Sequence, residues 1–212
     1  MDYDCVYIDK ELYWGSAPSN LCYKALEIYP PTKKSKLLDI GAGEGRNSLF
    51  FARNGYDVTA VEISEAGVEK INKQAKNNNL KIKTVKADYI DFQSKNTEQY
   101  DVVFSVGFMH YVPSALRFEI FDKLKEYTTI NGIHIMRTFV TKTNVSVEQT
   151  IDDALIKSFY SGELMVYYKD WDILLASEDK KECTSGGSAH KHVRNTVISR
   201  KVDSEFWRQY KM

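Results

Sequence analysis

The sequence predicts a doubly wound α/β fold, a Rossmann-like three-layer α/β/α arrangement around a mostly parallel sheet. Short apolar runs alternate along the chain with segments whose apolar residues recur at helical spacing. One of these runs ends in a glycine-rich turn that opens a helix. The 212 residues are 43% hydrophobic and 27% charged, as in an ordinary globular domain. We therefore expect a single domain over residues 1–212.

The first elements follow from apolar spacing and from helix-ending residues. Residues 1–30 contain an aromatic-rich arm and a helix expected over Ser16–Ile28, which Pro30-Pro31 ends. Lys36–Ile40 is a short apolar run typical of a strand buried on both faces. Arg46–Asn54 is expected to be a helix that closes on a glycine.

Three more strands and one helix are expected next. Val58–Ile63 is a second buried strand, and Ser64 can cap a helix that runs through Ala75. Leu80–Ala87 alternates apolar residues with lysines, which is typical of an edge strand. Tyr100–Val106 is more apolar, so we expect it near the centre of the sheet.

The last third of the chain changes rhythm. A helix over Ser114–Tyr127 leads into a fifth strand, Ile133–Val140, and residues 141–168 are expected to form a helical insertion near the site. Trp171–Ala176 and Val193–Lys201 are apolar enough for strands, but residues 177–192 between them carry no helical pattern. Because a parallel crossover usually needs a helix, we expect five parallel strands followed by an antiparallel pair.

The glycine turn carries the strongest functional signal. Gly41 and Gly43 lie between a buried strand and a helix, where the backbone can pass close to a ligand and the helix N-terminus favours a negative group. Dinucleotide sites prefer G-x-G-x-x-G, whereas Arg46 occupies the third glycine position here. A bulky cation favours S-adenosylmethionine, which has no pyrophosphate and has a carboxylate to hold, over a nicotinamide cofactor.

Polar residues end the neighbouring strands, where ligands of open α/β sheets bind. Glu62 can accept hydrogen bonds from both ribose hydroxyls, although a solvated carboxylate would look the same. Asp88 can accept from an adenine amine while Tyr89 or Ile90 covers the ring, or it can be an ordinary strand-ending residue. His110, after the fourth strand, either lines the site or is a buried core histidine.

The run from Leu37 to Ser64, LLDIGAGEGRNSLFFARNGYDVTAVEIS, resembles the opening motif of class I S-adenosylmethionine-dependent methyltransferases. Gly45–Ser48, Asn54–Val58 and the later stretch from Ser161 to Trp171 are similar to the tellurite-resistance (TehB-like) group. The resemblance spans about residues 12–202. It implies a seven-stranded sheet whose last strand is antiparallel, and S-adenosylmethionine as cofactor with S-adenosylhomocysteine as product.

The residue patterns and the resemblance together define an expected cofactor site. The glycine turn, the strand ends and Tyr13 of the arm contribute to it, although an aromatic residue near a terminus can also simply fasten it to the core. The expected residues are Tyr13, Asp39, Gly41, Ala42, Gly43, Arg46, Asn47, Glu62, Ile63, Asp88, Tyr89, Ser105 and Val106.

The methyl acceptor is expected to be a small soft nucleophile. The sulfonium already activates the methyl group, so the protein mainly aligns the reactants, and no triad or paired-carboxylate motif is present. A tellurite- or selenite-like oxyanion or a thiol fits, with His190, Arg194 and His110 as candidate catalytic residues. His190-Lys191-His192 can equally be a solvent-facing strand entrance. No metal is expected, because His190, His192 and Cys183 lack a fourth ligand at a familiar spacing.

Net charge and hydropathy limit the kinds of partner that we expect this protein to bind. The 29 basic and 29 acidic residues give no net charge, which argues against nucleic-acid binding, and no apolar run is long enough to cross a membrane. Without a signal-peptide pattern, we expect a cytoplasmic monomer or homodimer that acts on a small molecule. Two other functions remain open: a nicotinamide-dependent oxidoreductase and a non-catalytic S-adenosylmethionine-binding module.

Overall fold

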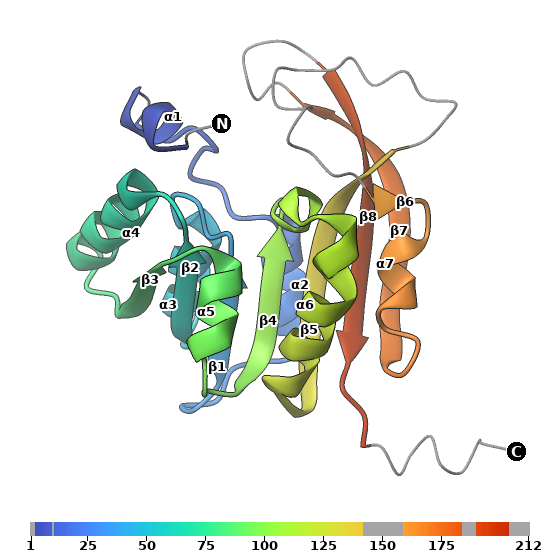
Figure 1. The fold of residues 1–212 in the computed structure, drawn as a ribbon. Coiled ribbons are helices and arrows are strands. Elements are labelled where there is room, and N and C mark those ends of the chain that lie inside the picture. Colours follow the sequence, from blue (N-terminus) through green and yellow to red (C-terminus); the bar gives the residue numbers. More distant parts are fainter. Residues whose placement is uncertain (1–2, 10, 142–158, 184–189, 204–212) are drawn as a thin grey trace, which may run out of the picture.

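The computed structural model describes residues 3–9, 11–141, 159–183 and 190–203. Its main sheet has the strand order β3-β2-β1-β4-β5-β8-β7, with β6 paired to β5 off this path (Figure 1). The strands are β1 (Lys36–Ile40), β2 (Asp57–Glu62), β3 (Ile82–Lys86), β4 (Tyr100–Val106), β5 (Thr128–Thr141), β6 (Phe159–Tyr160), β7 (Asp172–Cys183) and β8 (His190–Arg200). The strands β1 to β5 are parallel, and β8 is antiparallel to both β5 and β7, which confirms the predicted topology.

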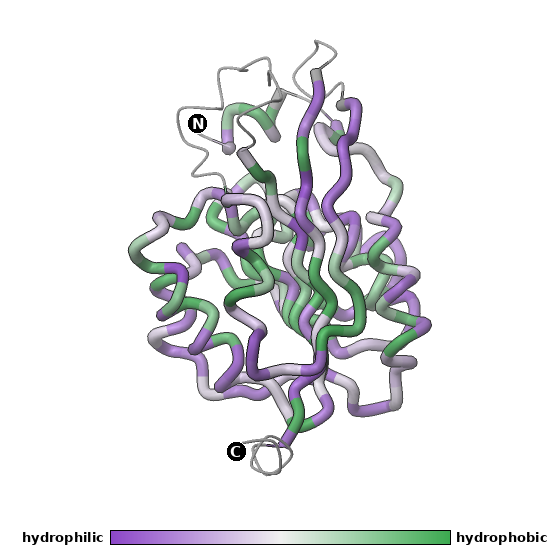
Figure 2. The backbone as a smooth tube through the Cα atoms, turned by 90° about the vertical axis from the view of Figure 1, so that its right-hand side faces the viewer, coloured by the Kyte–Doolittle hydropathy of each residue, from purple (hydrophilic) through white to green (hydrophobic). Residues whose placement is uncertain are grey.

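Helices cover both faces of this sheet. They are α1 (Tyr3–Asp9), α2 (Asn20–Ile28), α3 (Arg46–Arg53), α4 (Glu65–Asn77), α5 (Tyr89–Lys95), the 3-10 helix η1 (Met109–Tyr111), α6 (Ser114–Glu126) and α7 (Glu163–Val166). Apolar residues of α2 and α3 pack on one face of the strands, and those of α5, α6 and α7 pack on the other. In Figure 2 the central strands are hydrophobic over much of their length. The three-layer prediction is therefore confirmed.

Three helix predictions need correction. The helix expected from Ser16 begins at Asn20, because Ser19 lies outside it as the N-cap and accepts a hydrogen bond from Leu21 N. The helix α1 lies within the aromatic-rich arm, for which no helix was predicted. The helix α5 was also missed: Asp88 does not simply end a strand but caps this helix through Ile90 N.

The C-terminal hairpin is longer than predicted. The polar residues 177–183 continue β7, and the last strand starts at His190, so the two strands pair from Asp172↔Arg200 to Cys183↔His190. Polar side chains are tolerated in this part of the hairpin, because the segments 177–179 and 191–194 include exposed or partly exposed positions. The expected helical insertion falls mostly on residues 142–158, outside the described residues.

The carboxyl ends of the parallel strands meet at one edge of the sheet, below α1 in Figure 1. Val140 pairs with Val193 of β8 and also with Phe159 of β6. Since β8 occupies one side of β5, β6 must lie on the β4 side, beyond the last β4–β5 pair at Val106↔Arg137. The chain therefore re-enters the fold at the carboxyl end of β5, beyond its pairing with β4.

Candidate functional site

The glycine turn after β1 has a backbone that requires glycine. Gly41, Gly43 and Gly45 have φ values of 69°, 58° and 86°, in the left-handed region that other residues seldom adopt. A Cβ atom on Gly41 would also lie 2.5 Å from Cβ of Phe108. Gly41 N and Ala42 N both donate to Val61 O at 3.0 Å, so the turn is fixed to the neighbouring strand β2.

Asp39 at the end of β1 is a buried carboxylate beneath this turn. Ser48 of α3 donates its hydroxyl to Asp39 Oδ2 at 2.5 Å. Burial raises the pKa of Asp39 to about 7; the negative charge of Glu62 acts in the same direction, while the Ser48 hydroxyl and Arg46 oppose it. A cationic group arriving at the turn would favour the ionised form of Asp39.

Glu62 ends β2 and links two parts of the predicted cofactor site. Its carboxylate accepts hydrogen bonds from Gly43 N at 2.7 Å and from Ser64 N at 3.0 Å. Burial raises the pKa of Glu62, and the backbone N–H donors oppose this effect. Because each carboxylate oxygen has more than one acceptor position, the side chain retains capacity for hydroxyl donors beside the glycine turn.

The residues expected around an adenine ring differ in how far their side chains are exposed. Ile63 and Ile90 follow Glu62 and Asp88, and they are 57% and 44% exposed. Asp88 is exposed, and Ile90 N donates to its Oδ1 at 2.8 Å. Tyr89 instead is buried in the core, where its ring lies edge-on to Phe108. Ile63 and Ile90, rather than Tyr89, are therefore available to cover a planar ring.

The turn also holds the N-terminal arm through Trp14. Trp14 N donates to Glu44 Oε2 at 3.1 Å, and Arg46 Nη1 donates to Trp14 O at 2.9 Å. Tyr13 packs edge-on against Trp14, with ring centroids 4.8 Å apart. In this structure Arg46 thus positions the arm over the turn. Asn47 positions the start of α2 in a similar way, because its Oδ1 accepts a hydrogen bond from Ser19 N at 2.9 Å.

The helix α1 lies across the same end of the sheet (Figure 1). Asp4 accepts from Ser64 Oγ at 2.5 Å and from Ala66 N at 3.0 Å, at the start of α4. Tyr7 accepts from Trp14 Nε1 at 3.0 Å, and a Cβ on Gly43 would lie 3.1 Å from the Tyr7 hydroxyl. Tyr3 hydrogen-bonds Tyr111 beyond β4. The helix α1 and the arm thus cover the glycine turn with aromatic side chains.

Beyond β4 and β5, aromatic rings form a stack. His110 is buried, and its ring lies 4.5 Å from that of Phe139, which stacks on His192 at 4.2 Å. Burial, followed by the nearby His192, lowers the pKa of His110 to about 3, so its ring is neutral. No hydrogen-bond partner for His110 Nδ1 is found among the described residues. Ser105, also buried, donates to Ile40 O at 3.4 Å, and Val106 is partly exposed.

The predicted residues on β8 lie at this same edge, because β8 runs antiparallel to β5. Arg194 pairs in register with Phe139 and forms an ion pair with Asp179 of β7. The backbone of His190 begins β8 opposite Cys183. The structure therefore brings the glycine turn, Glu62, Asp88 and the acceptor-side candidates to one edge of the sheet.

Sequence reasoning missed several residues that contact this region. Asp4 and Tyr7 gave no motif, and their role depends on a fold-back of the N-terminus. Phe108 covers Gly41, and Arg137 lies on β5 beside the end of β4. Arg137 did carry a signal, because it is a charged residue inside an apolar strand.

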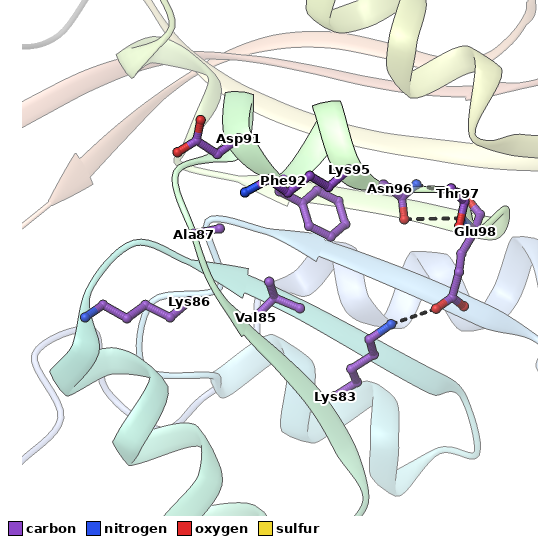
Figure 3. Close-up of a pocket in the computed structure, with 10 residues that line it drawn as sticks. All are labelled: Lys83, Val85, Lys86, Ala87, Asp91, Phe92, Lys95, Asn96, Thr97 and Glu98. Atoms are coloured by element: carbon purple, nitrogen blue, oxygen red, sulfur yellow. Dashed lines mark hydrogen bonds and ion pairs between the residues drawn. The ribbon is translucent and has the colours of Figure 1, made fainter.

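A separate groove lies at the edge of the sheet, between β3 and α5 (Figure 3). Phe92 and Val85 line it together with an ion pair between Lys83 and Glu98, whose atoms are 2.6 Å apart. None of the predicted site residues lines this groove. Within the described ranges, no helix is long and apolar enough to cross a membrane, and no cluster of three or more His, Cys, Asp or Glu side chains could hold a metal ion.

Comparisons with known proteins identify relatives of this chain that point to the same family. Residues 11–194 match the family model described as tellurite resistance protein TehB. A probable S-adenosyl-L-methionine-dependent methyltransferase TehB of Haemophilus influenzae is 29% identical over 170 residues, which are 78% of this chain and 57% of that protein. The chain thus spans little more than half the length of this relative.

Solved structures agree with the observed fold. The crystal structure of TehB from Haemophilus influenzae has a TM-score of 0.78 and 27% identity, covering 94% of this chain and 67% of that one. The Burkholderia thailandensis 1,6-didemethyltoxoflavin-N1-methyltransferase, solved with its substrate and S-adenosylhomocysteine, has a TM-score of 0.71 over 95% of this chain and 86% of that one. Its 17% identity supports the fold alone. Because the family model covers most of its length, this chain belongs to the TehB family.

Proposed function

We propose that this chain is an S-adenosylmethionine-dependent methyltransferase. The observation that carries the proposal is the hydrogen bond from Gly43 N to Glu62. It joins a ribose-type acceptor at the end of β2 directly to the turn suited to the amino-acid end of the cofactor. The family model and the relatives that carry this activity in their names support the same conclusion.

The residues present fit the cofactor in three places. The glycine turn has N–H groups and a helix N-terminus for a carboxylate, with the buried Asp39 beneath it for a cationic amine. Glu62 would hold the ribose. Asp88, Ile63 and Ile90 offer a carboxylate and two exposed apolar surfaces for adenine. When bound, the sulfonium supplies an activated methyl group.

On the acceptor side, we assign the chain a positioning role. Tyr13, Trp14 and α1 exclude water from the turn. His110 is buried and neutral, and its Nδ1 has no hydrogen-bond partner among the described residues, so we include it among the acceptor-side residues. We also include Arg194 and His190, because β8 carries them to the same edge. The acceptor we propose is a small soft nucleophile, either a tellurite- or selenite-like oxyanion or a thiol.

Calorimetric titration with S-adenosylhomocysteine tests the cofactor. A charge-assisted hydrogen bond contributes roughly 1.5–3 kcal/mol, so Glu62→Ala should weaken binding by roughly ten- to hundredfold. Glu65→Ala is the matched control, since Glu65 at the start of α4 is an exposed carboxylate that pairs with Lys86 of β3. Binding of NAD in place of S-adenosylhomocysteine would instead support an oxidoreductase.

An acceptor screen then tests the reaction. The protein is incubated with S-adenosylmethionine and tellurite, selenite, thiols, halides or small amines, and S-adenosylhomocysteine is measured. Formation of this product with a soft nucleophile is expected. Cofactor binding without turnover of any acceptor would support the non-catalytic module instead.

A further inference from the structure

Arg137 is a partly buried cation whose described hydrogen-bond partners are neutral. Its Nε donates to Thr196 Oγ1 at 3.0 Å, and its Nη1 donates to Asn20 Oδ1 at 3.0 Å. Within the described ranges its guanidinium takes part in no ion pair. A charge partly withdrawn from water is stabilised by an opposite charge, so this arrangement points to an anion that the described residues do not provide.

The charge on Arg137 persists at neutral pH. Burial, followed by the charge of Arg194, lowers the pKa of Arg137 to about 10, which still leaves the guanidinium protonated. Asp179 acts in the opposite direction, but its carboxylate accepts both Nε and Nη2 of Arg194. The negative charge of Asp179 is thus already matched by a different arginine.

The position of Arg137 connects it to the glycine turn. Arg137 pairs in register with Val106 at the end of β4, and Gly107 N donates to its carbonyl at 3.1 Å. Asn20, which accepts from Arg137, directly follows Ser19, whose N–H donates to Asn47 of α3. One short segment thus contacts both the guanidinium and the helix that begins at the turn.

An aromatic surface lies next to this cation. Phe139 follows Arg137 by two residues on β5, so both side chains lie on the same face of the sheet. Its ring contacts His110 on one side and stacks on His192 on the other. A ligand held by Arg137 would therefore find an aromatic wall at Phe139.

We propose that Arg137 binds the anionic group of the methyl acceptor, which is an oxyanion: a selenium or tellurium oxyanion or the carboxylate of an organic acceptor. This inference rests on the proposed methyltransferase function. A guanidinium presents parallel N–H donors that match two oxygen atoms of such a group. Thr196 and Asn20 hold the planar group in place, and Phe139 contacts the remainder of the acceptor.

The test is calorimetric titration of the full chain with selenite and, separately, with benzoate, with and without saturating S-adenosylhomocysteine. Arg137→Gln is expected to weaken binding of the recognised anion at least roughly tenfold, with unchanged affinity for S-adenosylhomocysteine. Arg53→Gln is the matched control, because Arg53 is an exposed arginine at the end of α3 that donates to Asn78. Should Arg137→Gln fail to fold, Arg137→Lys is measured and should also weaken binding, since lysine lacks the planar fork.

The two anions distinguish the sources of the oxyanion. Loss of selenite binding alone supports an inorganic oxyanion, and loss of benzoate binding supports an organic carboxylate. The inference is overturned if neither anion binds the unmodified protein. It is also overturned if Arg137→Gln and the control Arg53→Gln bind the anion equally well. Failure of S-adenosylhomocysteine to bind the unmodified protein would instead overturn the proposed function, so the two failures are distinguishable.

Discussion

Asp39 shows how a single buried side chain can couple stability to pH. Its carboxylate lies beneath the glycine turn with one hydroxyl donor, Ser48, and burial raises its pKa from 3.8 to about 7. The folded protein therefore binds more protons than the unfolded chain between these two pH values. The contribution of Asp39 to the free energy of unfolding is present below about pH 4 and is lost as pH rises to about 7.

Asp39→Asn isolates this contribution, because asparagine keeps an acceptor for Ser48 but cannot ionise. We expect the melting temperature of the unmodified protein, relative to the variant, to fall as pH rises from 4 to 7 and then to level off. Thermal unfolding of both proteins at pH values from 4 to 8 measures this difference. A difference that stays constant over that range would contradict the assigned pKa.

Individual site residues were predictable where the strand pattern located them. Glu62 and Asp88 follow apolar strands, so their meeting at one edge of the sheet follows from parallel topology. Arg46 was expected to hold a carboxylate, but in the structure it donates to Trp14 O. That contact depends on the path of an arm 32 residues earlier in the chain, which local spacing does not encode.

Among the elements, α1 is attached to the start of α4 through polar contacts of Asp4. Asp4 accepts from Ser64 Oγ and Ala66 N, and these two hydrogen bonds lower its pKa. Asp4→Ala should detach α1 from α4, because neither donor then has its acceptor in α1. We expect several-fold faster hydrogen exchange in residues 3–9 and several-fold faster dissociation of S-adenosylhomocysteine.

Hydrogen exchange monitored by mass spectrometry and a displacement assay for S-adenosylhomocysteine measure these two effects. Ile8→Ala is the control on the same helix, since Ile8 is 73% exposed. Unchanged exchange in the Asp4 variant would show that other contacts hold α1. Faster exchange with unchanged dissociation would show that α1 does not control access to the cofactor.

The elements that sequence reasoning missed are short ones whose stability depends on tertiary contacts. The strands β1, β2, β4 and β5 carried apolar runs, and β3 carried an alternation of apolar residues with lysines. All five were predicted within a few residues of their bounds, apart from the early start of β5. The helices α1 and α5 have seven residues each, too few to form without packing. The polar half of the β7–β8 hairpin was missed because its ladder is exposed and has no apolar alternation.

At the scale of the whole molecule, a buried ion pair joins α6 to the segment that re-enters the fold at β6. Arg117 Nη1 and Glu163 Oε1 are 2.7 Å apart, and the Arg117 side chain is only 2% exposed. Its guanidinium also lies 3.8 Å from the ring centroid of Phe159 and donates to Val112 O. This pair therefore fastens β6 and α7 to α6.

Glu163→Gln should destabilise the protein by about 3 kcal/mol, because it removes a negative charge that pairs with a buried guanidinium. Arg117→Met together with Glu163→Gln should recover part of this loss, since the buried positive charge is then absent. Denaturant unfolding gives the free energy of unfolding of the unmodified protein, of Glu163→Gln and of the double variant. Glu126→Gln is the control, because Glu126 forms an exposed ion pair with Lys123. A change below about 1 kcal/mol is expected for this control. Affinity for S-adenosylhomocysteine should stay unchanged in folded Glu163→Gln, because this pair lies on the opposite face of the sheet from Glu62. A double variant less stable than Glu163→Gln would show that Arg117 stabilises the fold through its other contacts rather than through the ion pair.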